Sequence, residues 1–326
     1  MNDCITLAHG NGGKLSWELI DRLFLRYFST TLPKQGNDAA ELTLSGNRIA
    51  MTTDSFVVHP ITFPGGNIGK LAVCGTVNDL LTAGAHPRYL SCGLIIEEGL
   101  PLAELESVIA SMAETARACG VEIVTGDTKV VQKGAADKLF INTTGVGVLR
   151  QGVDLSAHLI RPGDQVIVTG TLGEHGCSIL LAREELNIGT DIISDCAPLT
   201  GLVDALLATG VEIHAMRDPT RGGLATTLNE LAGQSRTAMI LHEDKIPVND
   251  SVRGLCEILG LDPLYLANEG KMIIVAPQHA CDTIMRTLVG HPLGQNAQVI
   301  GEVVAEPARR VLLQTSISKR ILDMPI

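Results

Sequence analysis

The sequence has few aromatic residues and lacks the long apolar runs and basic clusters that mark several classes of protein. Only 3% of its 326 residues are aromatic. No stretch of about 18 apolar residues occurs, so we expect no membrane-spanning helix. The first ten residues, MNDCITLAHG, lack the charged start and apolar middle of a signal peptide. The net charge of −11 argues against a nucleic-acid partner, because phosphate binding needs clustered Lys and Arg.

Closely spaced cysteines are also missing. The eight cysteines are widely spread, and no CxxC pair occurs among them. A structural zinc site needs ligands at short, regular spacings, so this distribution disfavours zinc. Disulfides are rare in reducing compartments, and the pattern therefore predicts a reduced, cytoplasmic protein.

The sequence does contain enough apolar residues to bury a full core. Hydrophobic residues make up 45% of the chain, and glycine is frequent, with 34 residues. Such a composition is typical of α/β layers packed by Ala, Val, Ile and Leu and joined by tight turns. The length suggests two domains.

Hydrophobic periodicity and turn residues predict an alternation of strands and helices in both halves. In the first half we expect helices at 15–28, 69–83 and 102–119 and strands at 48–53, 89–97, 121–125 and 139–149. In the second half we expect helices at 174–184, 199–209, 222–233 and 248–259 and strands at 165–169, 237–241, 271–276, 297–304 and 309–314. A polar, turn-rich stretch at 150–163 separates them, so we predict two mixed α/β domains, 1–155 and 156–326.

Four aspartates, Asp38, Asp54, Asp79 and Asp127, are predicted to lie at or near the ends of strands and helices. Asp79 differs because it falls inside an apolar helix, where a carboxylate needs a partner. Two carboxylates ~4 Å apart repel by roughly 4 kcal/mol at an effective dielectric near 20, and a divalent cation reverses that sign. If the four converge, they predict a Mg²⁺ site. Taken singly, each is equally typical of a helix cap or a turn.

A glycine-rich segment, HGNGGK, precedes these aspartates. Its residues Gly10, Gly12, Gly13 and Lys14 could approach phosphates with backbone N–H groups. The segment does not match a P-loop, because Lys14 is followed by Leu15 and not by Ser or Thr. A plain surface turn remains the alternative.

Three later segments carry further candidate residues. The stretch RDPTRGGL opens a predicted helix, so Arg221 and the backbone N–H groups at the helix start, near Gly222, could bind an anion. Asp218 could bind a metal or cap the helix. Lys129 follows Asp127 in GDTK, where a compact charge suits a phosphate or an oxyanion, although an exposed turn is the alternative. Glu269 precedes a buried strand and could be a base, a metal ligand or a turn residue.

Together these segments resemble the ATP-binding enzyme family that includes aminoimidazole ribonucleotide synthetase, selenophosphate synthetase, thiamine monophosphate kinase and the hydrogenase maturation factor HypE. The resemblance spans nearly the whole chain and is greatest to the HypE branch. It rests on the blocks HGNGGK, GNDAA, TTDSFVVHP, GGNIGKLAVCGTVNDLLTAGAHP, TGDTKVV, NTTGVG, MRDPTRGGLATTLNE and LANEGKM. Each block alone is weak, and their order is highly specific.

The resemblance implies two α/β domains and a homodimer that joins through the N-terminal β-sheets. It implies Mg²⁺ and ATP as cofactors, with the metal held by residues matching Asp38, Asp54, Asp79 and Asp127. We extend the predicted nucleotide contacts, beyond the glycine segment and the RDPTRGGL block, to Asn78 and Thr128.

The resemblance also implies a reaction. In the HypE branch, the carbamoyltransferase HypF loads a carbamoyl group onto a C-terminal cysteine, and ATP-dependent dehydration converts the thiocarboxamide to a thiocyanate. The cyano group then passes to iron on the HypC–HypD complex for [NiFe] hydrogenase. We expect Glu269 to act as base or relay, and Lys129 to assist proton removal or hold the oxygen.

The end of the sequence departs from this family. The branch ends in Pro-Arg-Ile-Cys, whereas this sequence ends LDMPI and has no Cys after Cys281. We therefore expect the tail to be missing, through truncation or natural loss. Two other functions stay open: a non-catalytic ATP-binding assembly factor, and another amide-activating or selenophosphate synthetase-like enzyme.

Overall fold

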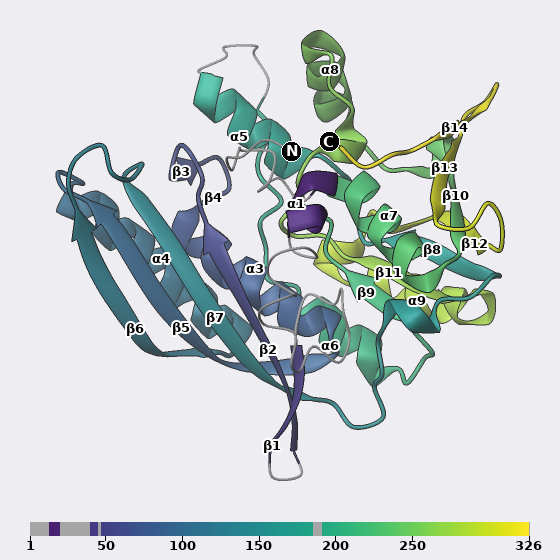
Figure 1. The fold of residues 1–326 in the computed structure, drawn as a ribbon, viewed down its shortest axis with the longest axis horizontal. Coiled ribbons are helices and arrows are strands. Elements are labelled where there is room, and N and C mark those ends of the chain that lie inside the picture. Colours follow the sequence, from purple (N-terminus) through teal and green to yellow (C-terminus); the bar gives the residue numbers. More distant parts are fainter. Residues whose placement is uncertain (1–12, 20–39, 45–46, 185–190, 326) are drawn as a thin grey trace.

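The chain folds into two α/β halves, each with its own sheet (Figure 1). The computed structural model describes residues 13–19, 40–44, 47–184 and 191–325. The prediction of two mixed α/β units is confirmed. Within the described residues, no helix has the length and apolar character needed to cross a membrane.

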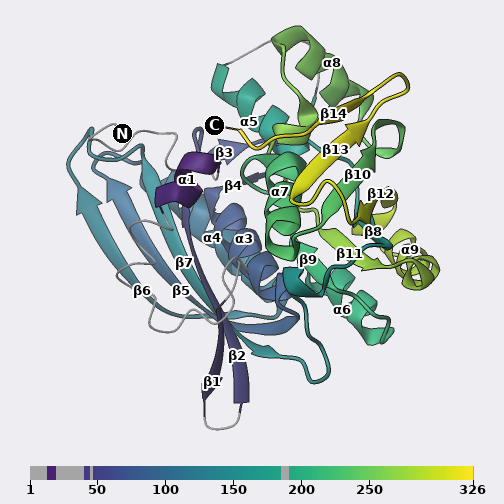
Figure 2. The ribbon, with the colours of Figure 1, turned by 45° about the vertical axis from the view of Figure 1, so that its right-hand side comes forward.

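The first half is a five-stranded sheet covered on one face by two long helices. The strand order is β1 (Ala40–Leu44), β2 (Asn47–Phe56), β7 (Leu139–Leu149), β5 (Ala85–Glu97) and β6 (Glu122–Val131). Helices α3 (Ile68–Thr82) and α4 (Leu102–Cys119) cover it, and a short ribbon, β3 (Thr62–Phe63) and β4 (Gly66–Asn67), leads into α3. A small helix, α1 (Lys14–Leu19), lies between the halves in both ribbon views (Figures 1 and 2).

Helix α3 is buried on nearly all sides, which explains its uninterrupted apolar sequence. It begins where Asn67 accepts hydrogen bonds from the N–H groups of Gly69 and Lys70. Gly69 lets α4 pack closely, because a side chain there would run into the carbonyl of Val108. Helix α3 is thus a fixed platform for the residues at its far end, including Asp79.

The other face of this sheet is open. Alternate residues of its strands point away from the helices, and Met51, Tyr89, Ile95 and Val148 are 40–50% exposed there. The edge strand β6 is exposed along nearly its whole length. The hollow of this face has a volume of about 380 Å³.

The second half contains a seven-stranded sheet and, in the part of it that the structure describes, five α-helices. The strand order is β14 (Lys319–Ile321), β13 (Arg310–Gln314), β10 (Ala238–His242), β12 (Gln298–Val304), β8 (Asp164–Val168), β11 (Ile273–Pro277) and β9 (Ala215–Arg217). The helices are α5 (Glu174–Glu184), α6 (Thr200–Ala208), α7 (Gly223–Ser235), α8 (Asp250–Leu259) and α9 (Cys281–Val289). Helix α7 covers one face of this sheet, and α6 and α9 pack on the other face, in the core that also includes residues of α3.

The two halves are joined by hydrogen bonds as well as by apolar packing. Asn78, on α3 and 1% exposed, donates to the carbonyl of Ala197 and accepts from the N–H of Leu199. Arg150, at the end of β7, forms an ion pair with Asp204 on α6. Residues 194–199 of the second half therefore lie directly against the first half.

Some sequence expectations about elements were wrong. Asp54 lies inside β2 and not at its end, and β6 continues through Asp127 to Val131 where we expected a loop. The apolar run stops at Thr125, but the pairing of Gly93 with Asp127 carries the ladder onward. Strands β1, β9 and β14 and helix α9 were not expected. The predicted helix at 15–28 is described only to Leu19, and the domain boundary at 155 stays a prediction.

Candidate functional site

The site begins with a pair of carboxylates between β2 and α3. The side chains of Asp54 and Asp79 are in hydrogen-bond contact, and the Thr52 hydroxyl donates to Asp79 Oδ2 at 2.8 Å. Burial raises the pKa of Asp54, while the contact with Asp79 and the charge of Arg221 act in the opposite direction. Two acids in contact favour a shared proton or a bound cation, because two bare negative charges at this range repel.

Arg221, on the loop between β9 and α7 in the second half, lies near enough for its charge to lower the pKa of Asp54. Gly222 and Gly223 both have positive φ, at 74° and 59°, and a side chain on Gly223 would collide with the carbonyls of Leu264 and Leu266. The DPTRGG sequence is thus needed for this turn. The N–H of Gly223 donates to the carbonyl of Thr220, and the helix start that follows Arg221 in the sequence could bind an anion.

Asp218 lies at the base of the same loop and is 8% exposed. Below it, Arg217 forms an ion pair of 2.7 Å with Glu230 on α7, which ties β9 to that helix. The loop is therefore supported from both ends.

Glu269 is the most strongly perturbed acid of the site. Burial raises its pKa well above the ordinary value, and the nearby groups of Cys196, Asp218, Asp195 and Asp54 raise it further, in that order. Asp54 belongs to the first half of the chain, so Glu269 lies at the junction of the two halves. A glutamate with a raised pKa is a suitable proton acceptor near neutral pH.

Asn268 was not predicted, yet it holds three loops of the site together. Fully buried, it accepts from Gly173 N at 2.8 Å and donates to the carbonyls of Pro219 and Leu266. In the sequence, Asn268 stands in the segment LANEG, where we predicted a role only for the neighbouring Glu269. Asn268 fixes the loop on which Glu269 lies.

His175 and Asp195 were also missed. His175 is 6% exposed, bonds Ser194 Oγ at 2.8 Å and meets the edge of the Phe63 ring. Its burial lowers its pKa to about 4, against a smaller opposite effect of Asp195. A histidine in the glycine-bounded segment TLGEHG could have indicated a buried site, whereas Asp195 gives no sequence signal by itself.

Asp127 and Lys129 do not join this cluster within one chain. Asp54 pairs with Thr143, whose hydroxyl contacts α3, so Asp54 is on the covered face of the sheet. Asp127 pairs with Gly93 and lines the hollow of the open face with Lys129. Three strand spacings, roughly 14 Å, also separate Asp127 from Asp54. The side chains of Lys129 and Asp127 are both exposed, and Lys129 Nζ lies 4.0 Å from Asp127 Oδ2.

The remaining predicted residues have mixed positions. Both polar atoms of Asn78 are engaged in bonds to the second half, so its amide holds the halves together. Thr128 lines a different hollow, between β6 and α4. Lys14 is exposed, and its N–H donates to the carbonyl of Pro325. Gly13 is buried. Gly10, Gly12 and Asp38 lie outside the described residues.

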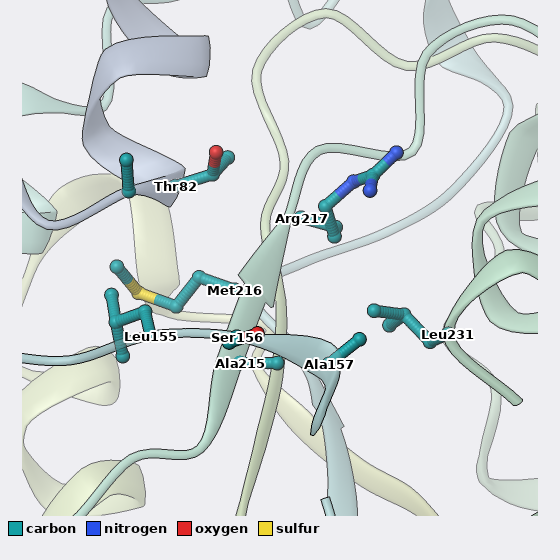
Figure 3. A pocket seen from close by; sticks show the side chains of 9 residues that line it. Thr82, Leu155, Ser156, Ala157, Ala215, Met216, Arg217 and Leu231 are labelled. Atoms are coloured by element: carbon teal, nitrogen blue, oxygen red, sulfur yellow. The ribbon is translucent and has the colours of Figure 1, made fainter. Parts of the chain in front are cut away.

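A small cavity at the junction is not the ligand site. It lies between the end of α3, the segment 150–163 that joins the halves, β9 and α7. Its lining includes Thr82, Ser156, Met216 and Arg217 (Figure 3). Its volume of about 10 Å³ has room for about one water molecule.

The donor set fits a divalent cation in part. Among the described residues, no three His, Cys, Asp or Glu side chains gather as metal ligands. The Asp54–Asp79 pair nevertheless offers carboxylate oxygens, which are the ligands that Mg²⁺ prefers, and phosphate oxygens and water usually complete such sites.

Comparison with known proteins decides the family. The N-terminal domain of AIR synthase related protein matches residues 36–149, and its C-terminal domain matches residues 161–314. Carbamoyl dehydratase HypE of Azotobacter vinelandii is 50% identical over 314 residues, which cover 96% of this chain and 92% of that protein. The chain belongs to the HypE family.

Solved HypE structures share the whole fold. A HypE in complex with ATP is 49% identical, with a TM-score of 0.84 over 99% of this chain and 98% of that one. The HypE of a HypE–HypF complex is 46% identical, with a TM-score of 0.89 over 94% and 99%. The prediction of an enzyme of the carbamoyl dehydratase family is thus confirmed. The roles of individual residues stay predictions.

Proposed function

We propose that this chain uses ATP to dehydrate a thiocarboxamide on a C-terminal cysteine to a thiocyanate, which supplies cyanide ligands for [NiFe] hydrogenase. The observation that carries the proposal is Glu269, an acid with a raised pKa at the junction of the halves, beside the Asp54–Asp79 pair. Family membership and the ATP complex of a relative support the same conclusion.

The nucleotide would lie between the halves. Asp54 and Asp79 would hold Mg²⁺, which supplies charge neutralisation to the phosphates when bound. Arg221 and the start of α7, with Gly222, would face the phosphate oxygens from the other side. Asp218 would orient this loop.

The chemistry needs a better leaving group and a proton acceptor. Amide oxygen leaves poorly, so transfer of the γ-phosphoryl group to that oxygen, with loss of one N–H proton, would give a phosphorylated imidate. Loss of the second N–H proton and of phosphate then forms C≡N, so that ATP and the thiocarboxamide become thiocyanate, ADP and phosphate. Glu269 would accept an N–H proton, because its raised pKa suits a base near neutral pH.

The position of Lys129 and Asp127 supports a homodimer with a composite site. Both are on the open face of the sheet and point away from Glu269 of their own chain. An exposed apolar sheet face with Met51, Tyr89, Ile95 and Val148 is suited to pairing with a second copy. We propose that Asp127 and Lys129 of the partner subunit complete the site, where Lys129 would hold the departing oxygen.

The cellular partners follow from the reaction. HypF would deliver the carbamoyl group, and a HypE–HypF complex of a relative supports this pairing. The HypC–HypD complex would receive the cyano group. All of these steps would take place in the cytoplasm.

The test follows protein mass. A chain that carries the family's Pro-Arg-Ile-Cys tail is incubated with HypF and its carbamoyl donor, and then with Mg²⁺ and ATP. We expect a carbamoyl adduct that loses one water only after ATP is added. A matched chain with Ser in place of the tail Cys should gain no adduct. A carbamoyl adduct that persists with ATP bound would contradict the proposal and favour an assembly factor.

A further inference from the structure

Asp195 is almost wholly enclosed next to Glu269, in the segment of the second half that lies against α3. Its side chain is 3% exposed. Oδ1 accepts from the N–H of Glu269 at 3.2 Å, and Oδ2 accepts from the N–H of Gly270 at 3.1 Å. Lys271 Nζ lies 3.3 Å from Oδ2. One carboxylate thus spans two successive amides and meets the cation that follows them.

The two segments fit closely in both directions. The N–H of Ala197 donates to the carbonyl of Glu269 at 3.3 Å, so a bond also runs back to the acid's own residue. A side chain on Gly270 would collide with the carbonyl of Asp195. The backbone of Glu269 is therefore held on both its N–H and its C=O side by residues 195–197.

If Asp195 had only a structural role, the loss of its charge would not change the pKa of Glu269. The groups that act on Glu269 are Cys196 and Asp195 on this segment, Asp218 on the β9–α7 loop, and Asp54 on β2. All of them disfavour the ionised glutamate. Asp195 also bonds the backbone of Glu269, so it affects both the position and the charge of that acid.

We propose that Asp195 is a positioning residue for Glu269: its carboxylate binds the N–H groups of Glu269 and Gly270, and its pair with Lys271 fixes that carboxylate. This inference rests on the proposed role of Glu269 as base. Asp195 holds the amide pair that begins the Glu269 loop, and Lys271 offsets part of its negative charge. Substitution of either partner should move the proton affinity of Glu269, in opposite directions.

The first experiment measures the titration of Glu269 itself by infrared difference spectroscopy. The Glu269 carboxyl band is assigned by its loss in Glu269→Gln. In Asp195→Asn, the midpoint should fall by about one pH unit, because a neighbouring negative charge is removed. In Lys271→Gln, the midpoint should rise, because the charge of Asp195 is less compensated. This readout does not need turnover.

A second experiment measures dehydration of the carbamoylated tail as a function of pH. In Asp195→Asn the acid limb should move to lower pH, and the plateau rate should fall on the order of 10-fold to 100-fold, because Asn accepts from only one of the two amides. Asp262→Asn is the matched control: Asp262 also accepts from a backbone N–H, of Leu264, and pairs with a cation, Arg320, but elsewhere. It should leave the pH profile unchanged.

The outcomes separate the two proposals. If the chain that carries the Pro-Arg-Ile-Cys tail, without any other substitution, shows no ATP-dependent loss of water, the proposed function fails, and the infrared titration still decides the role of Asp195. If the chain is active and the Glu269 midpoint is the same in the unmodified chain, Asp195→Asn and Lys271→Gln, the inference about Asp195 is overturned. Should Asp195→Asn fail to fold, Lys271→Gln alone decides.

Discussion

Glu269 occupies a setting that disfavours its ionised form. Burial and four neighbouring groups all raise its pKa. A group whose pKa is higher in the folded state costs stability once pH exceeds that pKa, because the unfolded chain ionises more easily. The acid proposed for catalysis therefore weakens the fold at working pH, which is common at functional sites.

Replacing Glu269 with Gln should abolish dehydration and stabilise the chain. The gain should be absent below about pH 4.5, grow through the interval up to the raised pKa, and be complete above it. Urea unfolding of both proteins at pH 5 and pH 8 measures this difference. If the difference in the free energy of unfolding between the two proteins is the same at pH 5 and pH 8, the raised pKa of Glu269 is contradicted.

His175 should give the opposite pH dependence. Its pKa of about 4 lies below the ordinary 6.5, so the neutral ring is favoured in the fold and protonation favours unfolding. Stability linked to His175 is present above pH 6.5 and is lost as pH falls toward 4, by about 3 kcal/mol in total.

The variant His175→Asn keeps a partner for Ser194 without a titrating group. Its free energy of unfolding should fall less between pH 6.5 and 4 than that of the unmodified chain. His279→Asn, at a side chain 73% exposed, serves as the control and should behave like the unmodified chain. Equal acid sensitivity of all three proteins would refute the assignment.

A candidate functional residue could be recognised in the sequence where its type is unusual for its local structure. Asp79 inside an apolar helix was such a conflict, and the structure pairs it with Asp54. Asp195 lies in a segment without regular structure, where aspartate is ordinary, and only the folded chain brings it to Glu269. Sequence reasoning finds a residue that breaks a local rule and misses one whose role is purely tertiary.

At the scale of elements, α3 joins the halves through Asn78. Its amide satisfies a carbonyl and an N–H of the second half in a buried setting. Asn78→Ala would leave both groups without that partner, at a cost of about 2 kcal/mol or more. We expect the variant to unfold in two steps, because the halves are then less coupled.

The measurement is calorimetry of the variant beside a matched control. Asn229 also makes two bonds to carbonyls, of Ala225 and Leu322, but both belong to the second half. Asn229→Ala should lower stability and keep the transition shape of the unmodified chain. Identical transition shapes in the two variants would show that Asn78 does not couple the halves.

Helices and strands whose apolar residues recur at a regular spacing were predicted well. Strands whose extent depends on a neighbouring strand were not. Helix α4 and strand β7 have the bounds expected from apolar spacing alone. Strand β6 extends past its apolar run because β5 offers backbone partners as far as Val131. Since the GDTK block therefore lies in a strand, the face it occupies is set by register, which no local pattern encodes.

At the scale of the whole molecule, the proposed composite site can be tested by mixing subunits. Lys129→Met and Glu269→Gln should each be inactive alone. After the two are unfolded and refolded together, half of the dimers are hybrids with one intact site of two, so about a quarter of the activity should return. Activity that stays absent in verified hybrids would mean that Lys129 and Glu269 act within one chain.

The opposite faces of Asp127 and Asp54 have a genetic consequence. If one active site is formed by residues of two subunits, the phenotype of one allele depends on the other allele in the same cell. A cell that carries two different defective genes, one altered at Lys129 and one at Glu269, should regain hydrogenase maturation that neither gene supports alone. Conversely, an abundant doubly altered copy should interfere with a normal one, and the defect would then be dominant.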